Sequence, residues 1–256
     1  MSAVLETRGL TKTFGAVTAA AAISLAIEED TVVGLIGSNG AGKTTFVNLV
    51  TGYLKPTSGT IHYRGRDITA LQPRQVTRLG VCRSFQIPQV FDTLTAYENL
   101  LVGLGIAARH GRLPSAARAD EKAEEEADAT LRRFGLDRFR GAPAGILPEG
   151  VRKLLDIAMA VVVKPDILLL DEPTSGVSAE EKFALMDLVL GAIRAEKVTV
   201  LFVEHDMEIV RRYTQRIVAF YEGRVIADGP TGDVLLNPEV RRYVVGETAA
   251  PPERAC

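Results

Sequence analysis

The chain has 256 residues, of which 46% are hydrophobic and 24% are charged, and its 30 lysine and arginine residues are balanced by 32 aspartate and glutamate residues. This length suffices for one large domain or two small ones with an ordinary core. A net charge of -2 gives no reason to expect a nucleic-acid-wrapping surface, because binding to phosphate backbones requires at least a basic stripe. We therefore expect no nucleic-acid partner, although a local basic patch is compatible with this charge.

Two cysteines, Cys82 and Cys256, are too few for the disulfide framework of a small secreted domain, and this favours a reducing compartment. The first residues lack the basic region and the continuous apolar region of a signal peptide. The longest weakly polar stretch, residues 16–27, is much shorter than the roughly 20 residues that a membrane-spanning helix needs. We expect that the chain itself does not cross a membrane, which leaves open whether it binds to one.

Short strands dominate the predicted structure of the first third of the chain. Residues 4–10 and 23–27 alternate apolar and polar side chains, which is typical of half-buried strands, and an apolar run covers residues 31–36. This run leads into a glycine-rich loop from Gly37, and a helical pattern begins near Lys43. A hairpin or meander of antiparallel strands and one more short strand follow, at residues 61–68 and 81–85.

The middle of the chain has a helical character. Leucines recur at helical spacing after residue 93, and residues 118–128 carry dense alternating charge with many alanines. A charge run of this kind is usually the solvated face of a helix. We interpret the segment as a helical subdomain, at about residues 93–160, that is inserted into an α/β body.

Strands and helices alternate after this insertion. Such an order favours a mostly parallel sheet with helices on its faces, so we expect an α/β fold with an antiparallel β subdomain beside that sheet. The expected domain covers residues 1–248, and residues 249–256 are expected to form a flexible tail. The predicted helices cover residues 154–163, 179–195 and 238–245, and the predicted strands cover residues 167–170, 198–203, 216–221 and 224–228.

Between a predicted strand and a predicted helix lies the phosphate-binding pattern G-x-x-x-x-G-K-[ST]. Glycines let successive backbone N–H groups point at phosphates, and the helix N-terminus adds the positive end of its dipole. Lys43 would neutralise the charge of the β- and γ-phosphates, and the Thr44 hydroxyl would bind Mg²⁺. The alternative is a glycine-rich turn of purely structural use. The residues of this loop are Gly37, Ser38, Asn39, Gly40, Ala41, Gly42, Lys43 and Thr44.

Two carboxylates, Asp171 and Glu172, follow the apolar run at residues 167–170. Ligands of open α/β sheets bind at the carboxyl ends of the strands, so we expect both carboxylates beside the phosphate loop. Asp171 would hold Mg²⁺ through water, and Glu172 would polarise the attacking water. Without the phosphate loop upstream, a pair of solvated acids at the start of a loop would be the alternative interpretation.

Three more residues are candidates because of where they stand in the chain. His205 follows the predicted strand at residues 198–203 and could reach the γ-phosphate, although a lone histidine is more often structural. Gln86 directly follows the strand at residues 81–85 and could bind both the metal and the attacking water, although most glutamines after a strand are simply exposed surface residues. Phe14 could stack on adenine or belong to the core.

The order and approximate spacing of these candidates resemble those of the nucleotide-binding cassette of ABC transporters. The resemblance covers nearly the whole chain and implies a P-loop NTPase fold with a RecA-like body, ATP and Mg²⁺ as ligands, and ATP hydrolysis. It implies a Walker A loop that extends to Thr45, an A-loop aromatic residue at Phe14 and a Q-loop at Gln86. It also implies a Walker B strand that ends in the catalytic Glu172, and a switch histidine at His205. The segments that carry it are Phe14, residues 37–45, Gln86, residues 168–172 and His205.

The C-terminal part is similar to one subgroup, the ATPase subunits of branched-chain (hydrophobic) amino acid importers. Residues 221–230 and 234–240 carry this similarity, together with the long helical segment after residues 97–100. The subgroup implies transmembrane permease subunits as partners and, indirectly, a solute-binding protein. It implies a peripheral location at the cytoplasmic face of the cell (inner) membrane. Because two cassettes of this family sandwich two nucleotides, it also implies a second ATP-binding subunit, in a homodimer or a heterodimer.

Two segments depart from the pattern of the family. The signature, which the partner's nucleotide meets across the dimer, normally reads Leu-Ser-Gly-Gly-Gln. Pro148 replaces the serine whose hydroxyl would meet the γ-phosphate, and Glu149 brings a negative charge near a triphosphate. The D-loop, at residues 175–178, lacks its aspartate. The signature segment of this chain is Leu147, Pro148, Glu149, Gly150 and Val151.

The altered signature affects the two ATP sites of a dimer differently. It weakens the site that is built on the partner's phosphate loop, and a homodimer would alter both sites, so we hypothesise an asymmetric pairing with a second, related ATPase chain. The sequence predicts the ATP-hydrolysing subunit of an ABC importer for branched-chain amino acids or a related small solute. The alternative is a regulatory cassette outside transport, in which nucleotide controls association and hydrolysis is slow. The solute itself is not encoded here, because its binding residues lie in other subunits.

Overall fold

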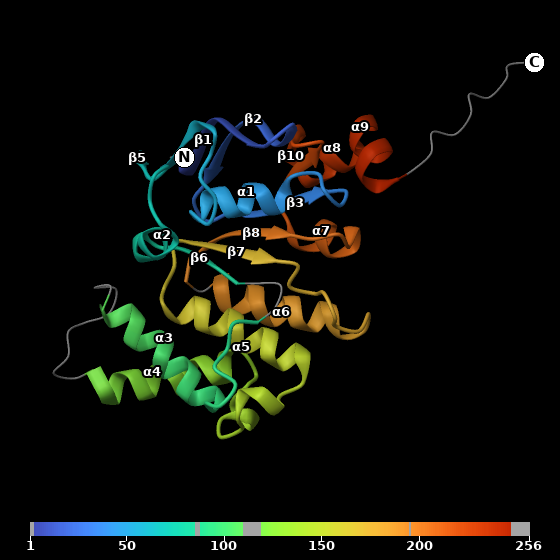
Figure 1. Ribbon diagram of the computed structural model, residues 1–256. Helices are drawn as coiled ribbons and strands as arrows, with labels where there is room; N and C mark the ends of the chain where they lie inside the picture. The colour runs from blue at the N-terminus through green and yellow to red at the C-terminus, as the bar shows by residue number, and fades with distance from the viewer. Residues whose placement is uncertain (1–2, 85–87, 110–118, 195, 247–256) are drawn as a thin grey trace, which may run out of the picture.

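The computed structural model describes residues 3–84, 88–109, 119–194 and 196–246, and it stacks two sheets and their helices in layers (Figure 1). An antiparallel sheet lies at one end, and a second sheet runs through the middle of the molecule. Helices α3 (Ala96–Arg109) and α4 (Ala119–Arg133) lie at the opposite end, where both pack against α5 (Glu149–Val162). The site described below lies at one edge of the middle layer.

The N-terminal third forms the four-stranded antiparallel sheet. Its first two strands have 12 residues each and are longer than the predicted segments 4–10 and 23–27. The prediction was too short because the ladder continues through several register shifts at which the apolar alternation breaks. The predicted hairpin supplies the other two strands. In spatial order the strands are β2 (Val17–Glu28), β1 (Ala3–Phe14), β4 (Ser58–Tyr63) and β5 (Arg66–Asp67).

The second sheet is mostly parallel, as the sequence predicts. Every neighbouring pair in its described part is parallel except the edge pair β10–β9. Because parallel strands need crossover connections, helices cover both faces, and all residues of β3, β7 and β8 are buried. In spatial order the strands are β10 (Arg224–Pro230), β9 (Arg216–Tyr221), β3 (Val32–Gly37), β8 (Thr199–Val203), β7 (Ile167–Asp171) and β6 (Val81–Arg83).

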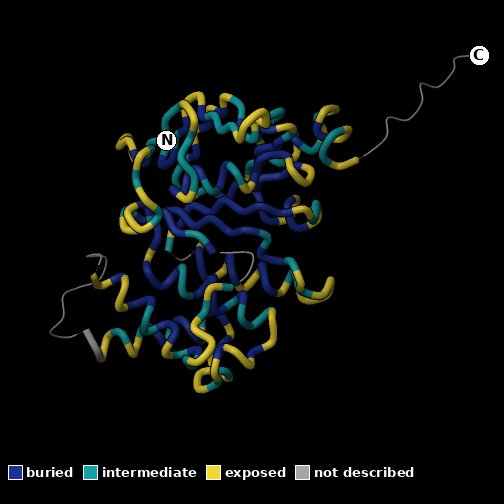
Figure 2. Tube along the Cα trace, viewed as in Figure 1, coloured by how far each residue is buried: buried dark blue, intermediate teal, exposed yellow. Residues whose placement is uncertain are grey.

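Two hydrophobic cores lie on the two faces of this sheet, whose strands form the continuous buried layer of Figure 2. Successive residues of β7 alternate between them, because side chains of a strand point to opposite faces. Leu168 and Leu170 belong to the core that includes α5 and α6 (Glu181–Arg194), whereas Leu169 belongs to the core shared with the antiparallel sheet and α1 (Lys43–Val50). One strand therefore contributes to both cores.

Several short helices were not predicted, because they bury too few side chains to show a helical period. They are α2 (Pro73–Leu79), α7 (Met207–Tyr213) and α8 (Thr231–Leu236). Helix α5 starts at Glu149, earlier than the predicted residue 154, since its apolar pattern begins only after the first turn. The helix predicted at residues 238–245 is instead the short α9 (Pro238–Val240), followed by the π-helical turn η4 (Arg241–Val245).

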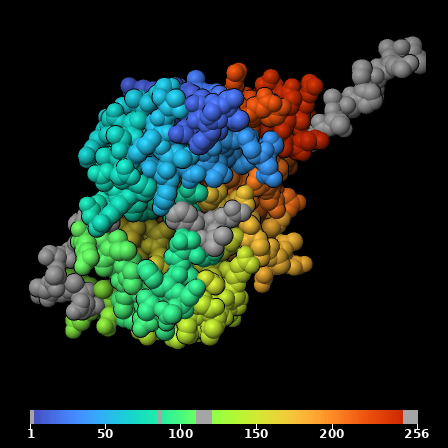
Figure 3. Space-filling model, in the orientation of Figure 1, coloured from blue at the N-terminus to red at the C-terminus, as the bar shows by residue number. Residues whose placement is uncertain are grey.

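The first and last described segments lie side by side. Strand β10 contacts β2, and η4 contacts β3 and β9, so the segments coloured blue and red are neighbours in Figure 3. The C-terminal elements thus complete the body that the N-terminal strands begin. Within the described residues, no helix has both the length and the apolar composition that a membrane span requires.

Candidate functional site

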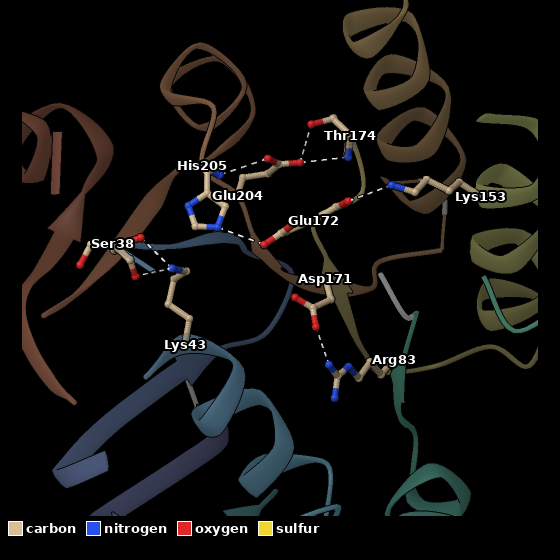
Figure 4. Close-up of polar contacts among 10 residues, drawn as sticks. Ser38, Lys43, Arg83, Lys153, Asp171, Glu172, Thr174, Glu204 and His205 are labelled. Atoms are coloured by element: carbon tan, nitrogen blue, oxygen red, sulfur yellow. Dashed lines mark hydrogen bonds and ion pairs between the residues drawn. The ribbon is translucent and has the colours of Figure 1, made fainter. Parts of the chain in front are cut away.

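The polar candidates gather where parallel strands of the second sheet end (Figure 4). β3 leads into the phosphate loop, β7 ends at Asp171, and β8 is followed by Glu204 and His205. Asp171 pairs in register with Val203, and Leu35 pairs with the same residue from the other side. Strands of one direction and one register bring the three loops to the same edge.

At two positions of the phosphate loop, the backbone conformation and the close neighbours allow only glycine. Gly37 and Gly42 have φ angles of 155° and 104°, in a region that side chains disfavour. A Cβ atom at Gly37 would lie 2.5 Å from the carbonyl oxygen of Phe220, and one at Gly42 would lie 2.5 Å from that of Ala19. Between them Ser38, Asn39 and Gly40 are exposed. The loop therefore presents backbone, free of bulky side chains, ahead of the N-terminus of α1.

Lys43 begins α1 and is almost fully buried. Its Nζ atom donates hydrogen bonds to the carbonyl oxygens of Gly37 at 2.6 Å and Ser38 at 3.1 Å. Burial lowers the pKa of Lys43, while the nearby charges of Glu172 and Asp171 act in the opposite direction. Thr44 is exposed and Thr45 is half-buried in the first turn of α1, so the loop carries one cation and the accessible hydroxyls of Ser38 and Thr44 beside two carboxylates.

Asp171 forms an ion pair with Arg83, the last residue of β6. Arg83 also donates to the Oδ1 atom of Asn48 in α1 at 2.5 Å, so it connects three elements around the end of β7. The second carboxylate oxygen of Asp171 points away from Arg83, toward the side where Lys43 lies (Figure 4). Sequence reasoning missed Arg83, because only the order of the strands brings it next to a residue 88 positions away.

Glu172 and His205 contact each other directly, as the Oε1 and Nε2 atoms lie 3.0 Å apart. The two side chains are 25% and 41% exposed, so both can reach a ligand at the sheet edge. The backbone of Glu172 has φ = 48°, a left-handed conformation that is rare outside glycine. The two candidates therefore form one unit, which the sequence did not reveal.

Glu204 is a second residue that the sequence interpretation missed. It is almost fully buried, and its Oε1 atom accepts hydrogen bonds from the backbone N–H of Thr174 at 3.0 Å and from the Thr174 hydroxyl at 2.6 Å. Its Oε2 atom accepts from the N–H of His205 at 3.2 Å. Glu204 thus joins the segment after Glu172 to the segment that carries His205. The available signal was an acidic residue directly after an apolar strand.

Lys153 of α5 is the third such residue. Its ammonium donates to the carbonyl oxygen of Glu172 at 3.3 Å and to that of Ser175. Burial lowers its pKa, and the charges of Glu149, Glu204 and Glu172 act in the opposite direction. A lysine one turn into a helix looks like a surface residue in the sequence, so only its burial identifies it.

The signature segment spans the start of α5, which lies on the opposite face of the second sheet from α1 (Figure 1). Leu147 is buried, Pro148 occupies the N-cap and Glu149 begins the helix, while Gly150 and Val151 are half-buried. Phe14 is half-exposed at the end of β1, with the Nζ atom of Lys12 5.1 Å from the centre of its ring. Gln86 lies outside the described residues. The structure therefore groups Lys43, Asp171, Glu172 and His205, and it leaves Phe14 and the signature segment on other elements.

The chain is similar to known proteins over most of its length. The model of the family described as "ABC transporter" matches residues 20–175. The branched-chain amino acid transport ATP-binding protein BraF of Pseudomonas aeruginosa is 37% identical over 250 residues, which cover 95% of this chain and 98% of BraF. LivG of Escherichia coli, which carries the same description, is 36% identical with the same coverage.

Solved structures with this fold are ATP-binding cassettes. The ADP conformation of MJ1267, an ATP-binding cassette of an ABC transporter, superimposes with a TM-score of 0.82 at 30% identity, over 96% of this chain and all of that one. MJ0796, a bacterial ABC transporter cassette of dimeric structure, gives a TM-score of 0.77 at 25% identity, over 89% of this chain and 98% of that one. The P-loop cassette fold expected from the sequence is confirmed.

Proposed function

Because this chain belongs to the ABC transporter family, we propose that it is the ATP-hydrolysing subunit of an importer for branched-chain amino acids or a related small solute. It is an ATPase of that family. The observation that carries the proposal is the convergence of Lys43, Asp171, Glu172 and His205 at the carboxyl edge of the sheet, in a chain that matches transport ATPases over nearly its full length.

The phosphate loop supports binding of ATP as its magnesium complex. Its exposed backbone and the N-terminus of α1 would hold the phosphates, and Lys43 would neutralise their charge. Mg²⁺ prefers oxygen ligands and keeps several waters, which fits the exposed Thr44 hydroxyl and the Asp171 oxygen that faces away from Arg83. Gln86 is the further metal ligand in this proposal. The bound ion would neutralise charge that develops on the phosphates. The residues assigned to nucleotide are Phe14, Gly37, Ser38, Asn39, Gly40, Ala41, Gly42, Lys43, Thr44, Thr45 and Asp171.

Glu172 is the residue that we assign to the attacking water. A carboxylate at the strand end, beside the phosphate loop and 25% exposed, can accept a proton from water as it attacks phosphorus. His205 contacts the same carboxylate at 3.0 Å and so fixes its direction, and Gln86 assists in this proposal. The chain's own contribution is mostly positioning and charge stabilisation.

The partners proposed are transmembrane permease subunits and a second ATP-binding subunit. MJ0796 has a dimeric structure, which supports a nucleotide sandwiched between two cassettes, each offering its signature segment to the other. The names of BraF and LivG support attachment to permease subunits at the cytoplasmic face of the inner membrane and an indirect link to a solute-binding protein. Those names also favour a role in transport over a regulatory role with slow hydrolysis.

Replacing the proposed base tests this function. In the complex purified with its membrane subunits, Glu172→Gln is expected to lower ATP hydrolysis by about a hundredfold or more while ATP binding persists, because the phosphate loop is unchanged. Uptake of labelled leucine into cells that depend on this transporter is expected to stop as well. Glu180→Gln, an exposed glutamate close in sequence, is the matched control and should retain both activities. Full hydrolysis by Glu172→Gln, or purification without membrane subunits, would contradict the proposal.

A further inference from the structure

The left-handed backbone of Glu172 requires contacts that hold it. For a residue with a Cβ atom this conformation is strained, because the Cβ atom comes too close to the following carbonyl oxygen, and such residues persist where the surroundings determine them. The N–H of Glu172 donates to the carbonyl oxygen of Val203 at 3.0 Å. Its own carbonyl oxygen accepts from Lys153 at 3.3 Å, so two elements fix the peptide groups on either side of Cα.

Lys153 holds more than this one carbonyl. The same ammonium donates to the carbonyl oxygen of Ser175, three residues further along the loop. The lysine is 4% exposed, and burial of a cation is costly unless polar groups replace its water. The two carbonyl oxygens provide that replacement, which explains why the side chain stays inside and directed at the loop.

Helix α5 meets the same loop one turn earlier. Glu149 and Lys153 are four residues apart and so lie on one face of the helix. A Cβ atom on Gly176 would lie 2.5 Å from the Oε1 atom of Glu149, and one on Gly150 would lie 3.9 Å from Val177. The two segments that depart from the family pattern, the signature and the D-loop, are therefore in contact with each other. Loop residues 172–177 rest on two successive turns of α5.

We propose that Lys153 is a positioning residue that fixes Glu172 to helix α5 and keeps its carboxylate directed at His205. The inference rests on the role of Glu172 under the proposed function. Because α5 begins with the signature segment, the residues offered to the partner's nucleotide and the residue that acts on this chain's nucleotide move as one unit. A change at one of the two ATP sites is thereby transmitted to the other through the contacts of α5 with this loop, among which Lys153 is the one that binds the Glu172 backbone.

The spectrum of the histidines tests the positioning directly. The chain has three histidines, so their ring resonances are few, and His205→Gln identifies those of His205. Lys153→Met keeps the apolar stem and removes the donor, and we expect it to shift the His205 ring resonances while those of His62 stay in place. Arg152→Met is the matched control, since Arg152 directly precedes Lys153 in α5 and pairs with Asp92 instead. Lys153→Gln, which retains one donor, is expected to give a smaller shift.

Hydrolysis by the assembled complex gives the second readout. Lys153→Met is expected to lower kcat about tenfold or more, while the affinity for MgATP changes by less than about twofold because Lys153 does not contact the phosphate loop. In the Glu172→Gln background the same substitution is expected to have no further effect on hydrolysis, since the group that it positions is already absent.

Different outcomes separate this inference from the proposed function. Unchanged His205 resonances in folded Lys153→Met, judged by the His62 resonances and the melting temperature, would overturn the role of Lys153. If Lys153→Met does not fold, unshifted resonances in Lys153→Gln would overturn it equally. An equal further loss of hydrolysis in the Glu172→Gln background would also count against it. An active Glu172→Gln variant would instead overturn the assignment of Glu172 on which the inference rests.

Discussion

Arg83 and Asp171 form an ion pair whose side chains are only 9% and 8% exposed. Removing one partner of such a pair leaves a buried charge without the cation or anion that it bonds to, and this costs more than the pair itself contributes. Arg83 also donates a hydrogen bond to Asn48, so the same guanidinium connects helix α1 to the end of strand β7. At the scale of single residues, a buried cation determines where the proposed metal ligand points.

We expect Arg83→Met to lower the free energy of unfolding by about 3–5 kcal/mol, because it leaves the Asp171 carboxylate buried without its cation. Urea denaturation measures the change. The control is Arg64→Met, which removes more exposed pairs with Glu29 and Asp166 and is expected to cost about 1 kcal/mol or less. Equal losses of unfolding free energy for the two variants would contradict the idea that burial makes the loss of Arg83 costly.

Tyr63 connects two elements, because its hydroxyl on β4 donates to the Oδ2 atom of Asp166, just before β7, at 2.7 Å. The bond therefore ties the antiparallel sheet to the strand that ends at the site. Burial, and then the hydrogen bond to Asp166, raise the pKa of Tyr63 to about 12. Tyr213 on α7 has a pKa of about 12 as well, owing to burial and its hydrogen bond to Asp187.

These tyrosines predict a loss of stability in alkali. The pKa of Tyr63 is about 12 in the folded chain and about 10 in an unfolded one, so its protonated form stabilises the fold fully below the lower value. That contribution disappears as the pH rises from about 10 to about 12. We expect the difference in unfolding free energy between wild type and Tyr63→Phe to shrink over this interval, and likewise for Tyr213→Phe. A difference that stays constant with pH would contradict the raised pKa.

The motifs that the sequence predicted consist of neighbouring residues, whereas the site residues that it missed contact partners far away in the chain. The phosphate loop and Asp171–Glu172 can be recognised because their chemistry needs neighbouring residues in a fixed order. Arg83 meets Asp171 across 88 positions and Glu204 meets Thr174 across 30, so their partners depend on strand order, which periodicity does not encode. The short helices escaped for a related reason, since their stability comes from tertiary packing.

At the scale of the assembly, the proposed pairing of two cassettes determines how fast each ATP site can hydrolyse ATP. Under the proposed function, its phosphate loop and carboxylates would supply one half of a composite site, and its signature segment would supply half of the other. Pro148 has no hydroxyl, and Glu149 adds negative charge at the start of α5. A partner with the usual signature would therefore complete this chain's site better than a second copy of the chain would.

We expect the purified chain alone to hydrolyse ATP at least about tenfold more slowly per site than when it is paired with the second ATPase chain of its transporter, because missing donors at developing charge cost about that much or more. Steady-state ATPase assays at matched site concentrations measure this. Pro148→Ser is expected to raise the rate of the chain alone. An undiminished rate per site in the homodimer would rule out the asymmetric pairing.

The alternation of β7 between two cores places the site at the border between them. Leu169 and Leu170 are bonded neighbours in different cores, and the strand that carries them ends at Asp171. The NMR signals of isotope-labelled methyl groups at these two leucines would therefore report the packing of the two cores separately. Leu170 would report the core that includes α5 and α6, and Leu169 would report the core shared with the antiparallel sheet. If the helical half melts before the strand-rich half, the signal of Leu170 would broaden first. The carboxylates would then lie on the boundary between a melted and an intact half.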